Sequence, residues 1–203
     1  MIAIVDYGVG NLFSLSSSLK ALGLTAEITR DPAKLRAAER IILPGVGAFA
    51  DAKAKLDETG LVPLLKEEAE KKPFLGICLG MQLLFEQSCE YGMHEGLGFV
   101  RGEVADLRET LTDKTLKVPH MGWNSLEIQR DDPIFKYFKN GEYVYYVHSF
   151  YGRNCAESTL ATSQYGNVAV TGVVRSGRVY GTQFHPEKSG DAGLRLLKAF
   201  AEL

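Results

Sequence analysis

The 203-residue sequence has no marked excess of charge of either sign. It contains 23 Lys and Arg against 25 Asp and Glu, which gives a formal net charge of -2. A phosphate-binding surface spread along the chain, or a polybasic membrane surface, requires an excess of positive charge. The composition therefore disfavours both nucleic-acid binding and membrane-surface binding.

Cysteines and long apolar runs are scarce as well. Cys78, Cys89 and Cys155 form an odd set without Cys-x-x-Cys spacing, which suits neither a disulfide framework nor a zinc knuckle. The longest apolar run, residues 74–85, is interrupted by Gln82 and is too short to cross a bilayer. The first residues show no basic leader or cleavage site. We therefore expect a cytoplasmic protein without an export signal.

Common nucleotide-binding and metal-binding motifs are absent or weak. No Gly-Lys pair occurs, which excludes a Walker phosphate loop, and Phe13 replaces the third glycine of a possible dinucleotide fingerprint. Residues 45–50 match G-x-G-x-x-A, but a lone mid-chain match is weak. His94, His120 and His148 lack metal-ligand spacing and are expected to be structural or surface residues. We expect no metal and no cofactor.

The first half of the chain alternates strand-like with helix-like segments, which is typical of a parallel sheet with crossover helices. Expected strands cover residues 2–5, 24–30, 40–44 and 73–77. Leucines at positions 12, 15, 19 and 22 recur at helical spacing, and further helices are expected over residues 49–56, 61–72 and 79–87. The length fits little more than one domain. We therefore expect a single α/β domain over residues 1–203, with a mostly parallel central sheet flanked by helices.

Beyond Gly96 the pattern changes to shorter β-rich segments. They cover residues 102–107, 125–129, 143–150, 159–163, 168–175 and 179–184. We expect them to form an antiparallel extension of the same sheet. Residues 191–202 predict a closing amphipathic helix built on Leu194, Leu197 and Phe200.

The strongest chemical motif is Gly-Ile-Cys-Leu-Gly at residues 76–80, where a buried strand turns into a helix. With cysteine in place of serine this is the nucleophile-elbow pattern, in which small residues on both sides permit a sharp turn. The helix that follows presents free backbone N–H groups to Cys78, which favours its thiolate. Cys78 could also be a small buried hydrophobe, and the motif alone does not decide between the two.

A second motif, Phe-His-Pro-Glu at residues 184–187, favours the catalytic interpretation. A cysteine nucleophile needs a base, and the base needs an acceptor on its other ring nitrogen. Residues two apart in an extended segment point to the same side, so His185 and Glu187 can face one site. We therefore predict a Cys78-His185-Glu187 triad, in preference to a surface His and Glu in a turn.

Acyl chemistry also requires donors for an oxyanion. The turn at residues 43–47 supplies Gly45 and Gly47 at a strand end, and parallel strand ends share one edge of a sheet. Gln82 lies one helical turn after Cys78, so it could reach a polar substrate from the same face. We expect Gly45, Gly47 and Gln82 to contact the substrate.

Residues 76–82 together with residues 184–187 resemble the class I glutamine amidotransferases. The segments at residues 44–49 and 119–124 narrow the resemblance to the glutaminase subunits of the histidine pathway, and it covers essentially the whole chain. It implies a flavodoxin-like fold and hydrolysis of L-glutamine to glutamate and ammonia, with a glutamyl thioester on Cys78.

The resemblance also implies a partner and further site residues. In the family, ammonia passes through a protein tunnel into a (βα)8 cyclase subunit, so we expect a heterodimer with such a cyclase. Further substrate-binding residues are expected at Leu79, Ser149 and Phe150. Interface residues are expected at Asn11, Met121, Trp123 and Lys188.

Three alternatives remain open at this stage. The chain could be the glutaminase subunit of another class I amidotransferase, such as that of pyridoxal phosphate synthase, which is not expected to carry Met-Gly-Trp-Asn. It could also be a non-catalytic module of the same fold, although the triad is complete. Trp123, placed in a loop-like stretch and expected at an interface, could instead be a core residue.

Overall fold

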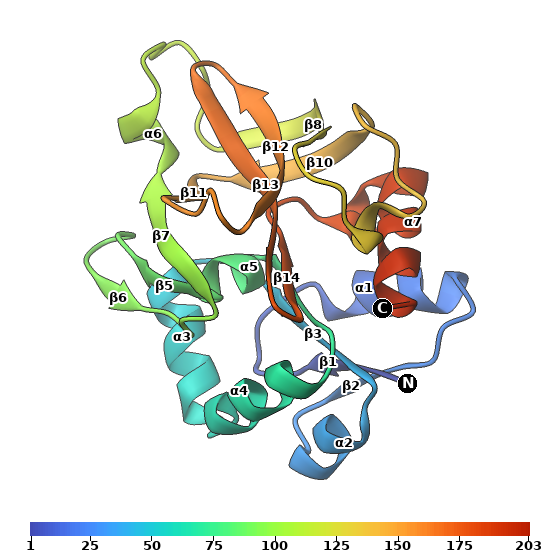
Figure 1. Ribbon diagram of the computed structural model, residues 1–203. Helices are drawn as coiled ribbons and strands as arrows, with labels where there is room; N and C mark the ends of the chain where they lie inside the picture. The colour runs from blue at the N-terminus through green and yellow to red at the C-terminus, as the bar shows by residue number, and fades with distance from the viewer.

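The computed structural model describes residues 1–203, which form fourteen strands, seven α-helices and two 3₁₀ turns (Figure 1). The strands are β1 (Ile2–Val5), β2 (Ala26–Thr29), β3 (Arg40–Gly45), β4 (Phe74–Cys78), β5 (Phe85–Ser88), β6 (His94–Glu95), β7 (Val100–Asp106), β8 (His120–Ser125), β9 (Glu127–Ile128), β10 (Tyr143–His148), β11 (Phe150–Arg153), β12 (Thr159–Tyr165), β13 (Val168–Ser176) and β14 (Val179–Thr182). The helices are α1 (Leu12–Ala21), α2 (Pro32–Ala37), α3 (Phe49–Glu58), α4 (Val62–Lys71), α5 (Leu79–Leu83), α6 (Leu107–Thr110) and α7 (Gly190–Ala201), and the 3₁₀ turns are Pro133–Phe135 and Pro186–Lys188.

The central sheet has eight strands in the order β2-β1-β3-β4-β14-β13-β12-β9. The first five are parallel, in the 2-1-3-4-5 order of flavodoxin-like folds, and β13, β12 and β9 continue the sheet antiparallel. This confirms the predicted fold class, a mostly parallel α/β sheet with an antiparallel extension. Parallel pairing also places the carboxyl ends of β3, β4 and β14 at one edge.

Helices cover both faces of the parallel strands, and every residue of β1 and β4 is therefore buried. On one face, α1 and α7 pack against Ile4 and Ile77 through residues such as Leu19 and Leu197. On the other face, α2, α3 and α4 pack against a second buried cluster that contains Phe74. The alternation of side chains along each strand therefore divides the core into two layers.

The predicted extension of a single sheet is wrong for part of the second half. β8 pairs only with β10, and β11, β7, β5 and β6 form a separate four-stranded sheet. The segment predicted as one strand over residues 143–150 is divided at Ser149, so β10 and β11 belong to different sheets. In Figure 1, β8 and β10 lie in the upper part of the molecule, whereas β5 and β6 lie at the left, near α5 and α3.

The helix predicted over residues 79–87 is also wrong beyond Leu83. The chain leaves α5 and enters β5, where Phe85 and Ser88 are buried while Glu86 and Gln87 are exposed. β5 pairs with β7 and with the two-residue strand β6. Backbone pairing with these strands overrides the local apolar pattern that predicted a longer helix.

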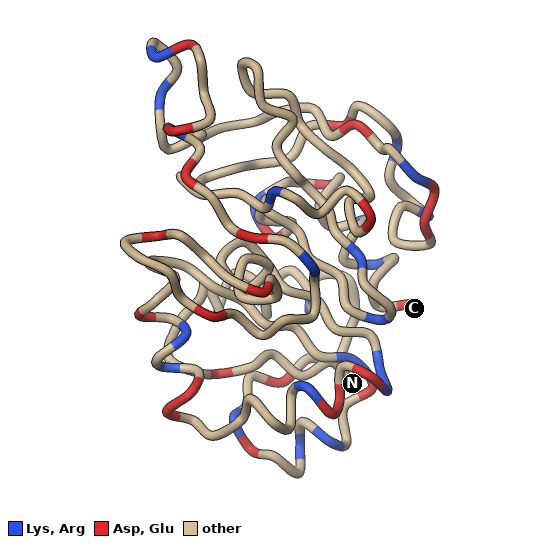
Figure 2. The backbone as a smooth tube through the Cα atoms, turned by 60° about the vertical axis from the view of Figure 1, so that its left-hand side comes forward, with Lys and Arg blue, Asp and Glu red and all other residues tan.

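Lys and Arg alternate with Asp and Glu around the whole outline of the backbone, with no large region of one sign (Figure 2). This distribution agrees with the near-neutral composition. None of the helices has both the length and the apolar character that crossing a membrane demands.

Candidate active site

Cys78 occupies a strained turn at the junction of β4 and α5. Its backbone has φ 55° and ψ -111°, a conformation that L-residues other than glycine rarely adopt. A Cβ placed on Gly80 would lie 1.9 Å from the Leu43 carbonyl oxygen, and one on Gly76 would lie 2.6 Å from the Gly80 carbonyl oxygen. Glycines two residues before and after Cys78 are therefore required by close backbone packing, as the elbow motif predicts.

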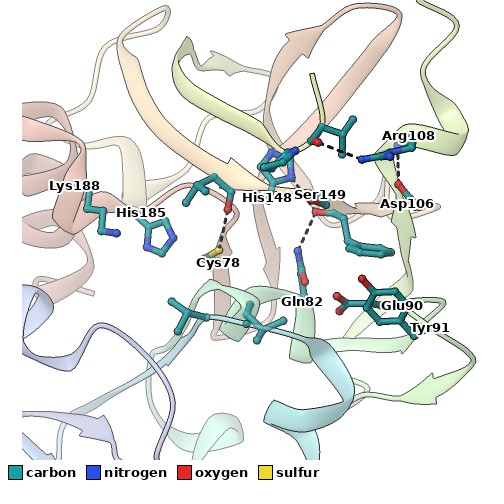
Figure 3. A pocket seen from close by; sticks show the side chains of 17 residues that line it. Cys78, Gln82, Glu90, Tyr91, Asp106, Arg108, His148, Ser149, His185 and Lys188 are labelled. Carbon is teal, nitrogen blue, oxygen red and sulfur yellow. Dashed lines mark hydrogen bonds between the residues drawn. The ribbon is translucent and has the colours of Figure 1, made fainter. Parts of the chain in front are cut away.

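His185 and Glu187 reach this turn because β14 lies directly beside β4. Thr182 of β14 is the register partner of Ile77, so the chain that continues from β14 passes next to Cys78. His185 Nδ1 lies 2.8 Å from Glu187 Oε1, and both side chains are 3% exposed. Figure 3 shows the His185 ring beside Cys78.

The surroundings of His185 favour its protonated form. Burial of the ring lowers its pKa, but hydrogen bonding with Cys78 and with Glu187, together with their negative charges, outweighs burial and raises the pKa to about 9. A protonated imidazole held beside a sulfur nucleophile can supply a proton to a leaving group. The arrangement is therefore suited to acyl transfer through a thioester.

A cavity of about 610 Å³ opens over the triad cysteine. Its lining residues are Val46, Gly47, Cys78, Leu79, Gln82, Glu90, Tyr91, Asp106, Arg108, Val118, Pro119, Val147, His148, Ser149, Phe150, His185 and Lys188. Figure 3 shows charged residues on both flanks, with Lys188 on the side of His185 and Arg108, Asp106 and Glu90 on the opposite side.

The structure brings together the residues predicted to bind substrate. Gly45 is the register partner of Cys78 in the neighbouring strand, while Gly47 (φ 92°) and Leu79 line the cavity. Ser149 and Phe150 line the same cavity.

Gln82 is also part of this cavity, and it is fixed in place by two acceptors. Its Nε2 donates to the Phe150 carbonyl oxygen at 2.9 Å and to Gln183 Oε1 at 3.1 Å. Gln82 is 5% exposed. Its amide is therefore held in one orientation by two protein acceptors.

Three further residues at the site lie outside the motifs identified in the sequence. Tyr7 is buried and donates from its hydroxyl to the Pro44 carbonyl oxygen at 2.6 Å, which holds the glycine turn. Gln183 donates through Nε2 to Cys78 Sγ at 3.8 Å. Glu90 is buried at the cavity and accepts from the Phe49 backbone N–H at 2.7 Å, and burial raises the pKa of its carboxyl. Only the glutamine next to the Phe-His-Pro-Glu motif could have been found by inspection.

The residues predicted at an interface are arranged in two places. Met121 and Trp123 are 61% and 55% exposed on one side of β8, so Trp123 is not a core residue. The loop expected around Trp123 is wrong, because residues 120–125 form a strand paired with β10. Lys188 is exposed beside the triad, and Asn11 caps α1 by accepting from the Ser14 backbone N–H at 3.4 Å.

The three cysteines are free thiols. No group of three or more His, Cys, Asp or Glu side chains is placed to hold a metal ion.

Comparison with known proteins identifies a family over nearly the whole length. The family model described as "Glutamine amidotransferase class-I" matches residues 3–202. A protein named "Imidazole glycerol phosphate synthase subunit HisH" from Caldanaerobacter subterraneus subsp. tengcongensis is 49% identical, over 100% of this chain and 98% of that protein. Its namesake from Listeria monocytogenes serovar 1/2a is 48% identical over 100% of this chain and 96% of that protein.

Solved structures support the fold. A chain described as "Crystal structure of glutamine amidotransferase" superimposes with a TM-score of 0.76 at 21% identity, covering 100% of this chain and 98% of that chain. A chain from "Structure of PurLQS from Thermotoga maritima" gives the same TM-score and identity, over 99% of this chain and 97% of that chain. At this identity the likeness concerns the arrangement of helices and strands.

Proposed function

The chain belongs to the class I glutamine amidotransferase family, and on that premise we propose that it is the glutaminase subunit of an imidazole glycerol phosphate synthase. In this role it hydrolyses L-glutamine to L-glutamate and ammonia, and it delivers the ammonia to a (βα)8 cyclase subunit in histidine biosynthesis. The observation that carries the proposal is the Cys78 elbow facing the cavity, with His185 and Glu187 hydrogen-bonded beside it. The names of relatives at 46–49% identity support the histidine pathway over other amidotransferases.

In the first half of the reaction, the Cys78 thiolate attacks the side-chain amide carbon of glutamine and a C–S bond forms. Negative charge then develops on the amide oxygen, where the turn containing Gly45 and Gly47 and the backbone at the start of α5 provide N–H donors. Protonated His185 gives its proton to the amide nitrogen, the C–N bond breaks, and ammonia leaves. Glu187 holds the ring in the orientation that this transfer needs.

In the second half, neutral His185 takes a proton from water as the water oxygen attacks the thioester carbon. The C–S bond then breaks, which returns Cys78 to the thiolate while His185 keeps the proton that it took from water. The new carboxyl group releases its own proton to solvent, and glutamate leaves. Gln82, Ser149 and Phe150 line the cavity around the substrate. The cycle consumes one water and one glutamine, and it needs no cofactor.

The cyclase partner forms a heterodimer through the exposed side of β8 and the region of Lys188. Exposed Met121 and Trp123 supply the large apolar contacts typical of interface anchors. A small void that is lined by Asn11, Pro44, His185 and Glu187, among others, lies between α1 and the triad. Direct transfer keeps ammonia unprotonated and nucleophilic until it is used.

Free thiols in all three cysteines agree with a cytoplasmic location.

The test is a glutaminase assay with a cyclase subunit from a relative's complex and its nucleotide ligand, compared with the chain alone. Cys78→Ala abolishes glutamate release, whereas the matched control Cys89→Ala keeps it. Mass spectrometry after treatment with 6-diazo-5-oxo-L-norleucine finds the adduct on Cys78 only. Glutamate release by the Cys78→Ala protein, or an adduct confined to Cys89 or Cys155, contradicts the proposal.

A further inference from the structure

Two buried histidines connect strand β8 with the substrate cavity, and the chemistry described above does not use either. His120 is 4% exposed and His148 is 5% exposed. They are direct register partners in the β8–β10 pair, and His120 Nδ1 lies 2.9 Å from His148 Nε2. His148 also lines the cavity that contains Cys78 (Figure 3).

Hydrogen-bond partners fix which nitrogen of each ring carries the proton. His148 Nδ1 lies 2.9 Å from the Phe150 carbonyl oxygen, which can only accept, so Nδ1 carries the hydrogen and Nε2 is an acceptor. His120 Nδ1 must therefore donate to His148 Nε2. His120 Nε2 is then an acceptor, and it faces the Asn124 side-chain amide donor at 3.4 Å. Each assignment follows from the one before it.

Both rings are held neutral and in a fixed plane. Burial lowers the pKa of His120 to about 4. Burial, followed by the neighbouring His120 and His185 charges, lowers the pKa of His148 to about 3. The His120 ring stacks on Tyr146 and Tyr165, with centroid distances of 4.8 Å and 4.1 Å. Such a pair can transmit a displacement from one strand to the next without changing its protonation.

The two ends of this chain of hydrogen bonds are at functional positions. At the cavity end, the Phe150 carbonyl oxygen accepts from His148 and also from Gln82, at 2.9 Å in each case. At the other end, His120 points inward from β8 while its neighbours Met121 and Trp123 are exposed on the opposite side. A partner that contacts these two residues therefore acts on the strand that carries His120.

We propose that the His120–His148 pair is a positioning device, which sets the Phe150 carbonyl and through it the Gln82 amide, and which ties both to the position of β8. The inference rests on the proposed glutaminase function and deepens it. The relay touches no reacting atom. Loss of the relay weakens glutamine binding and reduces stimulation by the partner subunit. It changes the rate of the chemical step at the triad much less.

The test compares two substitutions at one position. His120→Phe keeps an aromatic ring between Tyr146 and Tyr165 but removes the donor to His148. His120→Asn removes the ring but places a side-chain N–H near the former Nδ1. The measurement is the glutamine dependence of glutamate release, with and without the cyclase subunit.

For His120→Phe we expect KM for glutamine to rise about fivefold, the size expected from one hydrogen bond, with kcat in the complex within about twofold. Stimulation by the cyclase subunit, measured as the ratio of kcat/KM in the complex to kcat/KM of the chain alone, falls by a similar factor. His120→Asn stays within about twofold of the parent in both quantities. A parent-like Phe protein, or an Asn protein as impaired as the Phe protein, overturns the proposal, because packing alone would then account for His120.

Imidazole ¹⁵N chemical shifts of the unmodified protein give an independent test that no folding defect can obscure. The relay requires both histidines to be neutral with the hydrogen on Nδ1 from about pH 5.5 to 8. An Nε2–H form of either ring overturns it. Absence of glutaminase activity in the unmodified complex defeats the proposed function itself, whereas an active complex that is insensitive to His120→Phe defeats only the relay.

Discussion

Replacing Glu187 by Gln tests how the triad controls the proton on His185. The substitution keeps the shape of the side chain but removes the negative charge 2.8 Å from His185 Nδ1. Loss of an adjacent opposite charge lowers a pKa by about one to three units. We therefore expect the pKa of His185 to fall from about 9 to about 7. At pH 8 the protonated fraction then falls from about nine-tenths to about one-tenth.

The expected consequence is a pH-dependent loss of activity. At pH 8 the Glu187→Gln protein should hydrolyse glutamine at least about tenfold more slowly, because fewer molecules carry the proton for the leaving ammonia. At pH 6 both proteins are largely protonated at His185, so that part of the difference disappears. What remains at pH 6 measures the loss of ring orientation. Glu70→Gln, an exposed position on α4, is the matched control and should follow the parent at every pH.

The assay combines initial glutaminase rates from pH 5.5 to 9.5 with NMR titration of His185, which is assigned by comparison with His185→Asn. A rate ratio between parent and Glu187→Gln proteins that does not change with pH would refute the reasoning. So would a His185 titration midpoint near 9 in the variant. His185→Ala, which lacks the proton donor altogether, should be near-inactive throughout this range.

The same pKa governs how stability depends on pH. His185 has a pKa of about 9 in the folded protein and 6.5 as the ordinary value, so folding is favoured by its protonation. This stabilisation is fully present below pH 6.5 and is lost as the pH rises through about 9. The difference corresponds to about 3 kcal/mol at 1.36 kcal/mol per unit. Urea unfolding at pH 6 and pH 9.5 should show a smaller pH dependence for Glu187→Gln than for the parent.

Three further outcomes are expected from single substitutions. Cys78→Ser should abolish glutamate release with an unchanged melting temperature, whereas Cys89→Ser should stay active; activity in the first or its loss in the second would count against the assigned nucleophile. Gly80→Ala should cost about 3 kcal/mol or more in urea unfolding, because its Cβ would lie 1.9 Å from the Leu43 carbonyl oxygen, and a parent-like midpoint would contradict the elbow geometry. Trp123→Ala should weaken cyclase binding in calorimetry while the isolated chain keeps its melting temperature, since the side chain is 55% exposed; lowered stability with intact binding would exclude an interface role.

The sequence by itself determined the parallel half of the sheet and the chemistry of the triad. The apolar runs that became β1, β3 and β4 are buried on both faces, so periodicity and composition agree with the final structure. The spacing of Gly76, Cys78 and Gly80 implies a tight turn, and in the structure no side chain fits at either glycine. These features depend on residues close together in the chain.

The tertiary structure alone decided how the β-rich second half is divided. Residues 85–88 directly follow the apolar run that predicted a helix, yet they form β5 because β7 and β6 offer backbone partners. β8 and β10 leave the central sheet and pair with each other, which turns the predicted loop around Trp123 into a strand. Strand pairing depends on long-range partners, and a local pattern does not contain them.

Long-range contacts also decided which residues complete the site. Glu90 and the His120–His148 pair carry no local signal, since their roles depend on cross-strand neighbours and on burial. Residue types and spacing could thus predict the nucleophile, its base and the orienting acid, because those requirements are chemical and local. The groups that hold the substrate cavity in shape are specified by packing, which exists only once distant segments of the chain have come together.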